Sequence, residues 1–176
     1  MSTRSARLQV LNASQLKVTR NELPLEARQP AIDVLNGVVA EMIDISLAAR
    51  HAHWNVRSRS FMQLHELFGR INRDLANEID ELGERIAALG GVARGTVQAV
   101  AGETALDPFP TMVTSEQELI DALSQRLGQL ATALHHAIEA CEPLRDAVSV
   151  NHLTDAAAVV EKLLWLAESH LQPAHS

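Results

Sequence analysis

Residues 61–91 read FMQLHELFGRINRDLANEIDELGERIAALGG, and apolar side chains recur in this stretch at intervals of three and four. That spacing places them on one face of an α-helix. Gly90 and Gly91 end the pattern, as expected where the chain takes a positive φ after a helix. The stretch therefore predicts a helix over 61–89 with one buried face. The apolar residues of that face are Leu64, Leu67, Phe68, Ile71, Leu75, Ile79, Leu82, Ile86 and Leu89.

Three further segments carry the same periodicity: residues 31–54, a segment that opens at Ser115 and stops at Pro143, and residues 151–171. Ser115 and Glu118 fit a capping box, in which each side chain binds an unpaired backbone N–H of the first helical turn. No alternating, strand-like segment competes with these four helices. The sequence therefore predicts an all-α protein.

The connections between the helices predict their arrangement. Residues 90–114 form a long connection that can cross from one end of a bundle to the other, with a short helix at 97–100. One long crossover between two antiparallel pairs is typical of the ferritin-like four-helix bundle. We expect a flexible tail over 1–24, the bundle over 25–172 and a short tail over 173–176.

Composition excludes several classes of protein. The chain has 176 residues, 47% of them apolar, a net charge of −7 and one cysteine, Cys141. One domain of this size with so many apolar residues is not disordered, and a single cysteine forms no internal disulfide. No apolar run reaches the ~18–20 residues of a membrane span, and the first thirty residues lack the apolar core of a secretory signal. The net charge argues against a dedicated basic nucleic-acid-binding domain.

Four potential metal ligands lie in or near residues 61–91: His65, Asp80 and Glu84 within this stretch and His53 before it. Asp80 and Glu84 are four residues apart and share one helix face. His65 and Asp80 lie on nearly the same side of the helix but are about 22 Å apart along it. Metal–ligand bonds are about 2.0–2.2 Å long, so one chain cannot bring both to one metal. Either they are unrelated, or two copies of the helix run antiparallel, which predicts a two-fold dimer with two equivalent sites.

The sequence lacks the ligand pattern of an iron site built within one bundle. Di-iron sites inside a single bundle use Glu-x-x-His pairs. None of the eight histidines has a glutamate three residues before it. The usual site inside one bundle is therefore excluded.

The sequence resembles the Dps family, the DNA-binding proteins from starved cells, over about residues 19–171. The resemblance rests on Thr19-Arg20-Asn21, His53-Trp54-Asn55-Val56-Arg57, Phe61, Leu64-His65-Glu66, Asp80, Glu84-Arg85, Leu89-Gly90-Gly91, Gly95-Thr96, Leu164-Trp165-Leu166 and Glu168-Ser169. It implies a cytoplasmic, homododecameric hollow shell that oxidises Fe(II), typically with hydrogen peroxide, and stores ferric iron. It also implies a ferroxidase site between two subunits, with His53 and His65 from one subunit and Asp80 and Glu84 from the other.

The chain departs from the family pattern at Gly69. The family has His-Glu-x-x-Asp after the second histidine, whereas this chain has His65-Glu66-Leu67-Phe68-Gly69 and so lacks that carboxylate. Three readings are open. The site is weak or inactive; or water, Asn72, Glu66 or His51 fills the gap; or the site prefers another metal, such as zinc. His51 points about 200° away from His53 on a helix, which favours a surface or interface role for it.

Other residues carry expectations of their own. The family's acidic stretch near the last helix is replaced by Val150-Asn151-His152-Leu153-Thr154-Asp155, so Asp146 and Asp155 are the candidates to line a pore for iron. Trp54 and Trp165 are expected to be buried anchors, and Trp54 with Phe61 and Phe68 to wall the site. Surface positions are expected for His135, His136, His152, His170 and His175.

DNA binding is a further possibility that the resemblance raises, because members of the family commonly bind DNA through a basic N-terminal tail. The candidate contacts here are Arg4, Arg7 and Lys17, followed by Arg20. Many copies would multiply a weak attraction, whereas the net negative charge opposes it. The leading hypothesis is a Dps-type ferroxidase and iron store that protects the cell from oxidative stress, with protection of its DNA as a further hypothesis. The alternative is a non-enzymatic shell that binds DNA or another metal.

Overall fold

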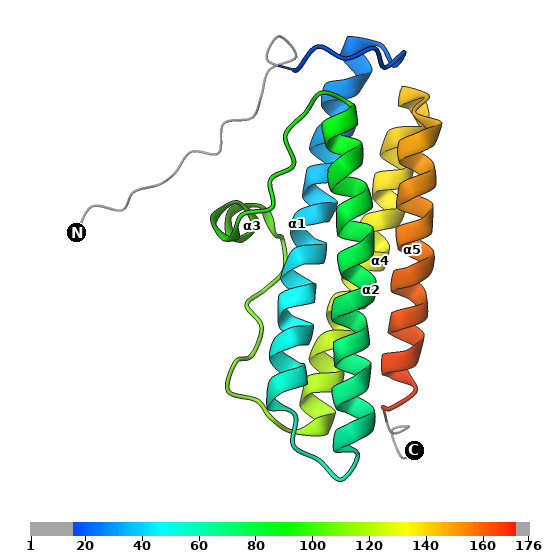
Figure 1. The fold of residues 1–176 in the computed structure, drawn as a ribbon. Helices are drawn as coiled ribbons and strands as arrows, with labels where there is room; N and C mark the ends of the chain where they lie inside the picture. Colours follow the sequence, from blue (N-terminus) through cyan, green and yellow to red (C-terminus); the bar gives the residue numbers. More distant parts are fainter. Residues whose placement is uncertain (1–15, 172–176) are drawn as a thin grey trace, which may run out of the picture.

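The computed structural model describes residues 16–171 and contains four long helices packed side by side (Figure 1). They are α1 (Leu25–Asn55), α2 (Phe61–Ala88), α4 (Glu116–Cys141) and α5 (Ala147–Glu168). A short helix, α3 (Val97–Glu103), lies in the crossover, and a 3₁₀ turn (Glu142–Leu144) follows α4. The predicted all-α, ferritin-like bundle is therefore confirmed.

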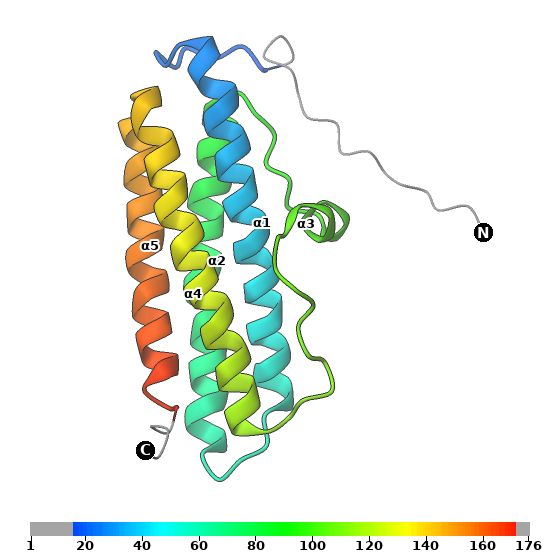
Figure 2. The same ribbon diagram turned by 180° about the vertical axis from the view of Figure 1, so that it is seen from behind.

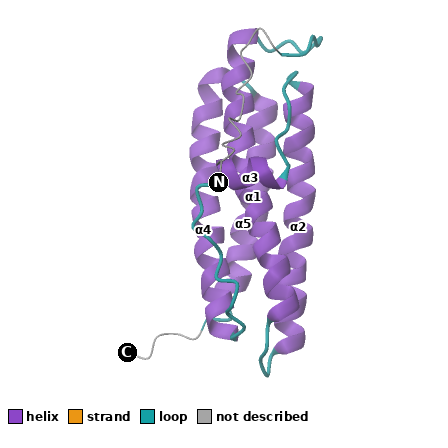
Figure 3. Ribbon diagram, turned by 90° about the vertical axis from the view of Figure 1, so that its left-hand side faces the viewer, coloured by secondary structure: helices purple, strands orange, loops and turns teal. Residues whose placement is uncertain are grey.

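The crossover runs the length of the bundle, from the end of α2 to the start of α4, and α3 packs outside the bundle beside α1 (Figures 2 and 3). It is attached at its far end, where the Arg57 N–H donates to the Thr114 carbonyl at 3.0 Å. Arg126, on α4, binds the Asp107 carbonyl and lies over the Phe109 ring. The crossover is thus held against the turn that joins α1 to α2.

Apolar residues of all four long helices form one core. Phe68, Met42, Leu75, Leu82 and Leu134 are fully buried in it. The predicted face of α2 is buried as expected, apart from Ile79, which is partly exposed. No helix among residues 16–171 is long and apolar enough to cross a membrane.

Gly90 ends α2 in the predicted manner. Its φ is +90°, the Gly90 N–H donates to the Ala87 carbonyl, and the Gly91 N–H donates to the Ile86 carbonyl at 3.0 Å. These bonds satisfy carbonyls that the helix end leaves unpaired. The Lys17 N–H donates to the Gly90 carbonyl at 2.8 Å, and a Cβ at Gly90 would lie 2.6 Å from the Lys17 carbonyl oxygen. Only glycine fits this close approach.

Two predicted helix starts were wrong. Helix α1 begins at Leu25 rather than residue 31, because Pro30 is accommodated within it and Pro24 precedes it. The Arg28 side chain donates to the carbonyls of Leu23 and Asn21, which secures the preceding segment. Helix α5 begins at Ala147 rather than residue 151, because Asp146 caps it by accepting the Ser149 N–H at 3.1 Å.

Two smaller predictions near α3 and α4 also need correction. The short crossover helix extends to Glu103 rather than ending at residue 100. At the start of α4, the Ser115 hydroxyl binds the Glu118 carboxylate directly, and neither side chain caps a backbone N–H. The capping box is therefore a side-chain pair only. Pro143 does end α4, as predicted, within the 3₁₀ turn.

Candidate metal centre

Two of the predicted ligands meet where α1 ends and α2 begins. His53 lies in the last turn of α1 and His65 in the second turn of α2. Their rings are stacked, with centroids 3.6 Å apart and an interplanar angle of 21°. The turn between the helices thus brings together residues that are twelve positions apart in sequence.

Each histidine is oriented by the other's main chain. His53 Nδ1 lies 2.6 Å from the His65 carbonyl oxygen, and His65 Nδ1 lies 2.8 Å from the His53 carbonyl oxygen. A carbonyl oxygen only accepts hydrogen bonds, so each Nδ1 carries the proton and donates it. The Nε2 of each neutral ring then keeps its lone pair for a metal ion, as in metal-binding histidines generally.

Aromatic side chains pack around this pair. The Phe61 ring stacks on His65 at 5.1 Å, whereas Phe68 of α2 is fully buried in the core of the bundle. The predicted apolar wall is therefore present at Phe61. Trp54 and Trp165 are not buried in the single chain, because 69% and 62% of their surfaces are exposed, and that prediction was wrong. Trp54 nevertheless borders the pocket that contains His53.

Asp80 and Glu84 lie farther along α2, and both are exposed. Because α2 is one unbroken helix from Phe61 to Ala88, the separation of about 22 Å between His65 and Asp80 holds in the structure. Within residues 16–171, no group of three or more histidine, cysteine or acidic residues is placed to hold a metal ion. A single chain therefore supplies two histidines and, elsewhere, two carboxylates.

At Gly69 the structure shows which side chains border the space of the missing side chain. A Cβ built on Gly69 would lie 3.0 Å from His53 Nδ1, 3.2 Å from His53 Cε1 and 3.3 Å from Arg73 Nη1. The His53 ring therefore packs directly on the backbone of α2. Any larger residue at position 69 would displace this ring or the Arg73 guanidinium.

Of the three side chains considered as replacements for this carboxylate, Asn72 and His51 make other contacts and Glu66 lines another pocket. The Asn72 amide donates to the Ser46 carbonyl and hydroxyl and accepts from Arg50. Glu66 borders a different pocket, near α5. The His51 ring packs edge-on against Phe109 of the crossover, with centroids 5.9 Å apart. Asn72 and His51 thus make contacts away from Gly69, and neither Glu66 nor His51 lines the pocket beside it.

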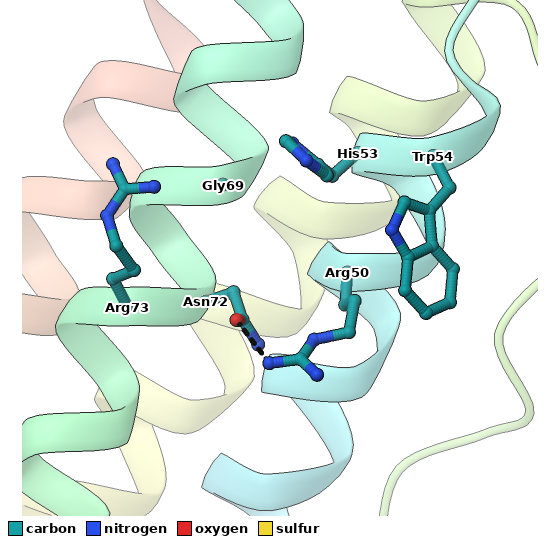
Figure 4. A pocket seen from close by; sticks show the side chains of 6 residues that line it. All are labelled: Arg50, His53, Trp54, Gly69, Asn72 and Arg73. Atoms are coloured by element: carbon teal, nitrogen blue, oxygen red, sulfur yellow. Dashed lines mark hydrogen bonds between the residues drawn. The ribbon is translucent and has the colours of Figure 1, made fainter.

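The pocket beside Gly69 is lined by cationic and polar residues, two of which, Arg50 and Arg73, were not predicted from the sequence. Arg50 and Trp54 of α1 and Asn72 and Arg73 of α2 surround it together with His53 and Gly69 (Figure 4). The spacing of Arg73 could have identified it as a pocket residue. It lies four residues after Gly69 and eight after His65, and so shares their helix face.

The two acids that were candidates to line a pore lie in different surroundings. Asp146 lines no pore: only 2% of its side chain is exposed, and its carboxylate binds Arg85 at 2.6 Å. Asp155 is exposed and lies near Glu78, whose pKa is raised by burial first and by the charge of Asp155 second.

His135, His136 and His170 are exposed as predicted, and His152 is partly buried. Arg4, Arg7 and His175 lie outside the described residues, and Lys17 is exposed.

Comparison with known proteins gives a matching family model and several similar proteins. Residues 32–174 match the model of the ferritin-like domain. The chain is 35% identical over 154 residues to a DNA protection during starvation protein of Agrobacterium fabrum, covering 88% of this chain and 95% of that protein. The chain belongs to the Dps family.

Solved Dps structures share its fold. Mycobacterium smegmatis Dps is 28% identical, with a TM-score of 0.84 over 90% of this chain and 95% of that one. DpsC from Streptomyces coelicolor is 24% identical, with a TM-score of 0.88 over 96% of this chain and 98% of that one. This Dps chain thus has the family fold along almost its whole length.

Proposed function

We propose that this Dps chain assembles into a closed homo-oligomeric shell, a dodecamer, that oxidises Fe(II) between pairs of subunits and stores the ferric product. His53 and His65 of one subunit would bind Fe(II) together with Asp80 and Glu84 of the partner subunit. The observation that carries the proposal is the reciprocal pair of Nδ1 bonds, which orients two imidazoles and leaves both Nε2 atoms available.

The donor set suits iron as a substrate. Imidazole binds Fe(II) well, and carboxylates favour the harder Fe(III) that oxidation produces. Hydrogen peroxide takes up two electrons and two protons to give two waters, so two Fe(II) ions that each lose one electron balance the reaction. The names of the relatives mention protection of DNA during starvation, which agrees with removal of Fe(II) and peroxide together. The same donors suit zinc, which we therefore expect to compete with Fe(II).

The division of the ligands between two subunits provides a direct test. We expect His65→Ala and Asp80→Ala homo-oligomers each to oxidise Fe(II) with peroxide no faster than the protein-free control. Co-expressed in one cell, the two variants form mixed dimers in which one of the two sites has all four ligands. Random mixing therefore restores about a quarter of the wild-type sites.

The readout is the ferric absorbance after mixing Fe(II) with peroxide under anaerobic conditions. Restored activity in the mixed preparation supports a shared site. Two inactive variants that remain inactive when co-expressed, despite forming mixed shells, contradict it. Wild-type protein that oxidises Fe(II) at the rate of the control rejects the ferroxidase function altogether.

A further inference from the structure

Two arginines face the proposed iron site where a carboxylate is missing. Arg50 lies one turn before Trp54 on α1, and Arg73 lies one turn after Gly69 on α2 (Figure 4). Between them is an open pocket of about 280 Å³. In the described part of the chain, no carboxylate forms an ion pair with either guanidinium. The pocket therefore carries two uncompensated positive charges.

The Arg50 side of the pocket is preorganised by hydrogen bonds. Arg50 donates to the Asn72 side-chain oxygen at 3.0 Å, and the Asn72 amide is fixed by bonds of 2.9 and 2.7 Å to the Ser46 carbonyl and hydroxyl. Arg73 Nη1 lies 3.3 Å from the position of a Gly69 Cβ, which itself lies 3.0 Å from His53 Nδ1. Guanidinium and imidazole thus flank the empty side-chain position of Gly69 from two sides.

The subunit pairing proposed above adds to this charge. The register that places His65 beside Asp80 and Glu84 of the partner subunit also places Arg73 beside residues 72–76 of the partner. The helix face between His65 and Asp80 consists of Gly69, Asn72, Arg73, Ala76 and Asn77, and it contains no carboxylate. Asp74, the nearest acid, is paired with Arg70 at 3.1 Å. Two copies of Arg73 would therefore approach each other beside two bound metal cations.

We infer that this pocket binds a small oxyanion, such as phosphate, carbonate or a carboxylate, between Arg50 and Arg73. The anion offsets the repulsion between the guanidinium groups and a metal cation, and it supplies the oxygen ligand that Gly69 does not provide. Arginine is suited to this role because its planar donors match carboxylate and phosphate oxygens. Since a water molecule takes about 30 Å³, the pocket of about 280 Å³ is large enough for such an anion with hydrating waters.

The anion site is argued from the single chain, whereas the added charge of the partner's Arg73 and the link to metal binding rest on the proposed iron site. The anion site itself is tested on the assembled, metal-free protein, with inorganic phosphate as the probe in isothermal titration calorimetry at low ionic strength. We expect one phosphate per chain, and binding weakened about tenfold or more in Arg73→Gln and in Arg50→Gln.

The matched control is Arg70→Gln. Arg70 lies on the same helix but pairs with Asp74, so this variant is expected to bind phosphate like wild type. Wild-type protein that binds no phosphate, or an Arg73→Gln variant that binds it unchanged, overturns the anion site. Titrations with bicarbonate and acetate then distinguish the possible sources of the oxyanion.

The link to metal is tested with Co(II), which is not oxidised under these conditions. Because binding of two ligands is reciprocal, we expect phosphate to tighten Co(II) binding about fivefold or more in wild type and to have no effect in Arg73→Gln. Phosphate binding without Co(II) binding supports the anion site and contradicts the proposed iron site. Co(II) binding that phosphate leaves unchanged in wild type contradicts the anion as a metal ligand.

Discussion

Gly69 determines how closely His53 approaches α2. In a helix interior, replacing glycine with alanine ordinarily stabilises by about 1 kcal/mol. At Gly69 the added Cβ would lie 3.0 Å from His53 Nδ1, the atom that donates to the His65 carbonyl. Alanine at this position would therefore favour the helix but disturb the orientation of His53, a proposed ligand.

We expect Gly69→Ala to slow Fe(II) oxidation by about tenfold or more, as loss of a ligand-orienting hydrogen bond typically does. Its gain in stability should be smaller than that of Gly128→Ala, the control, where no atom lies within 4 Å of the added Cβ. Urea unfolding and the peroxide assay measure both effects. Equal oxidation rates in Gly69→Ala and Gly128→Ala contradict the role of the His53 contact.

Cys141 is a second residue whose surroundings change its chemistry. Burial, and secondly the charge of Asp146, raise the pKa of its thiol to about 11 from 9.0, while Arg85 acts in the opposite direction. The folded state therefore favours the neutral thiol. This contribution to stability is complete below pH 9 and is lost as the pH rises toward 11, because the unfolded chain ionises first.

We expect the free energy of unfolding to fall between pH 9 and pH 11 more steeply in wild type than in Cys141→Ala. Urea titrations at several pH values measure the slopes. A thiol reagent at pH 8 should also react slowly with the folded protein and rapidly in urea, because the thiolate is the reactive form. Parallel slopes for the two proteins show that Cys141 does not carry the pH dependence.

At the level of helices, a buried ion pair joins α2 to α5. Arg85 of α2 binds Asp146 at 2.6 Å, with 9% and 2% of the two side chains exposed, and Asp146 also caps α5 through the Ser149 N–H. Removing one partner of a buried pair leaves an uncompensated charge, which costs about 3–5 kcal/mol. The loss of the cap adds to that cost.

We therefore expect Asp146→Ala to lower the free energy of unfolding by about 3–5 kcal/mol, measured by urea denaturation. The control is Glu161→Ala, which removes the exposed pair of His135 and Glu161, in which 58% and 54% of the two side chains are exposed. An exposed pair contributes about 0–1 kcal/mol. Equal losses in the two variants would show that the Arg85–Asp146 pair does not stabilise the fold.

The helices were predictable from sequence wherever local pattern decides them. Periodicity and Gly90 gave α2 within one residue at its end. The starts of α1 and α5 were not predicted correctly, because Pro30 lies inside α1 and Asp146 caps α5, and apolar periodicity shows neither. The stacked histidines follow from the turn between α1 and α2, and the cationic pocket depends on which faces of α1 and α2 oppose each other. Local sequence patterns do not show which helix faces meet, and only the spacing of these residues along each helix could have pointed to them.

For the whole molecule, DNA binding through Arg4, Arg7 and Lys17 stays a prediction. The net charge of −7 per chain opposes it, and many basic segments on one shell favour it. We expect the full-length protein to retard DNA in a low-salt gel shift and deletion of residues 1–12 to abolish the shift. Retardation should weaken as salt rises from about 50 to 200 mM. DNA of unchanged mobility with the full-length protein rejects the prediction.

The bond between Lys17 and Gly90 also determines where the preceding residues leave each subunit. Because it joins main-chain atoms at a position where only glycine fits, the point of departure is fixed on the surface of the bundle. In an assembly of identical subunits, these points form a regular array whose spacing follows from the subunit packing. If the N-terminal segments bind DNA as predicted, the symmetry of this array decides whether the segments of one assembly contact one DNA molecule or two at the same time.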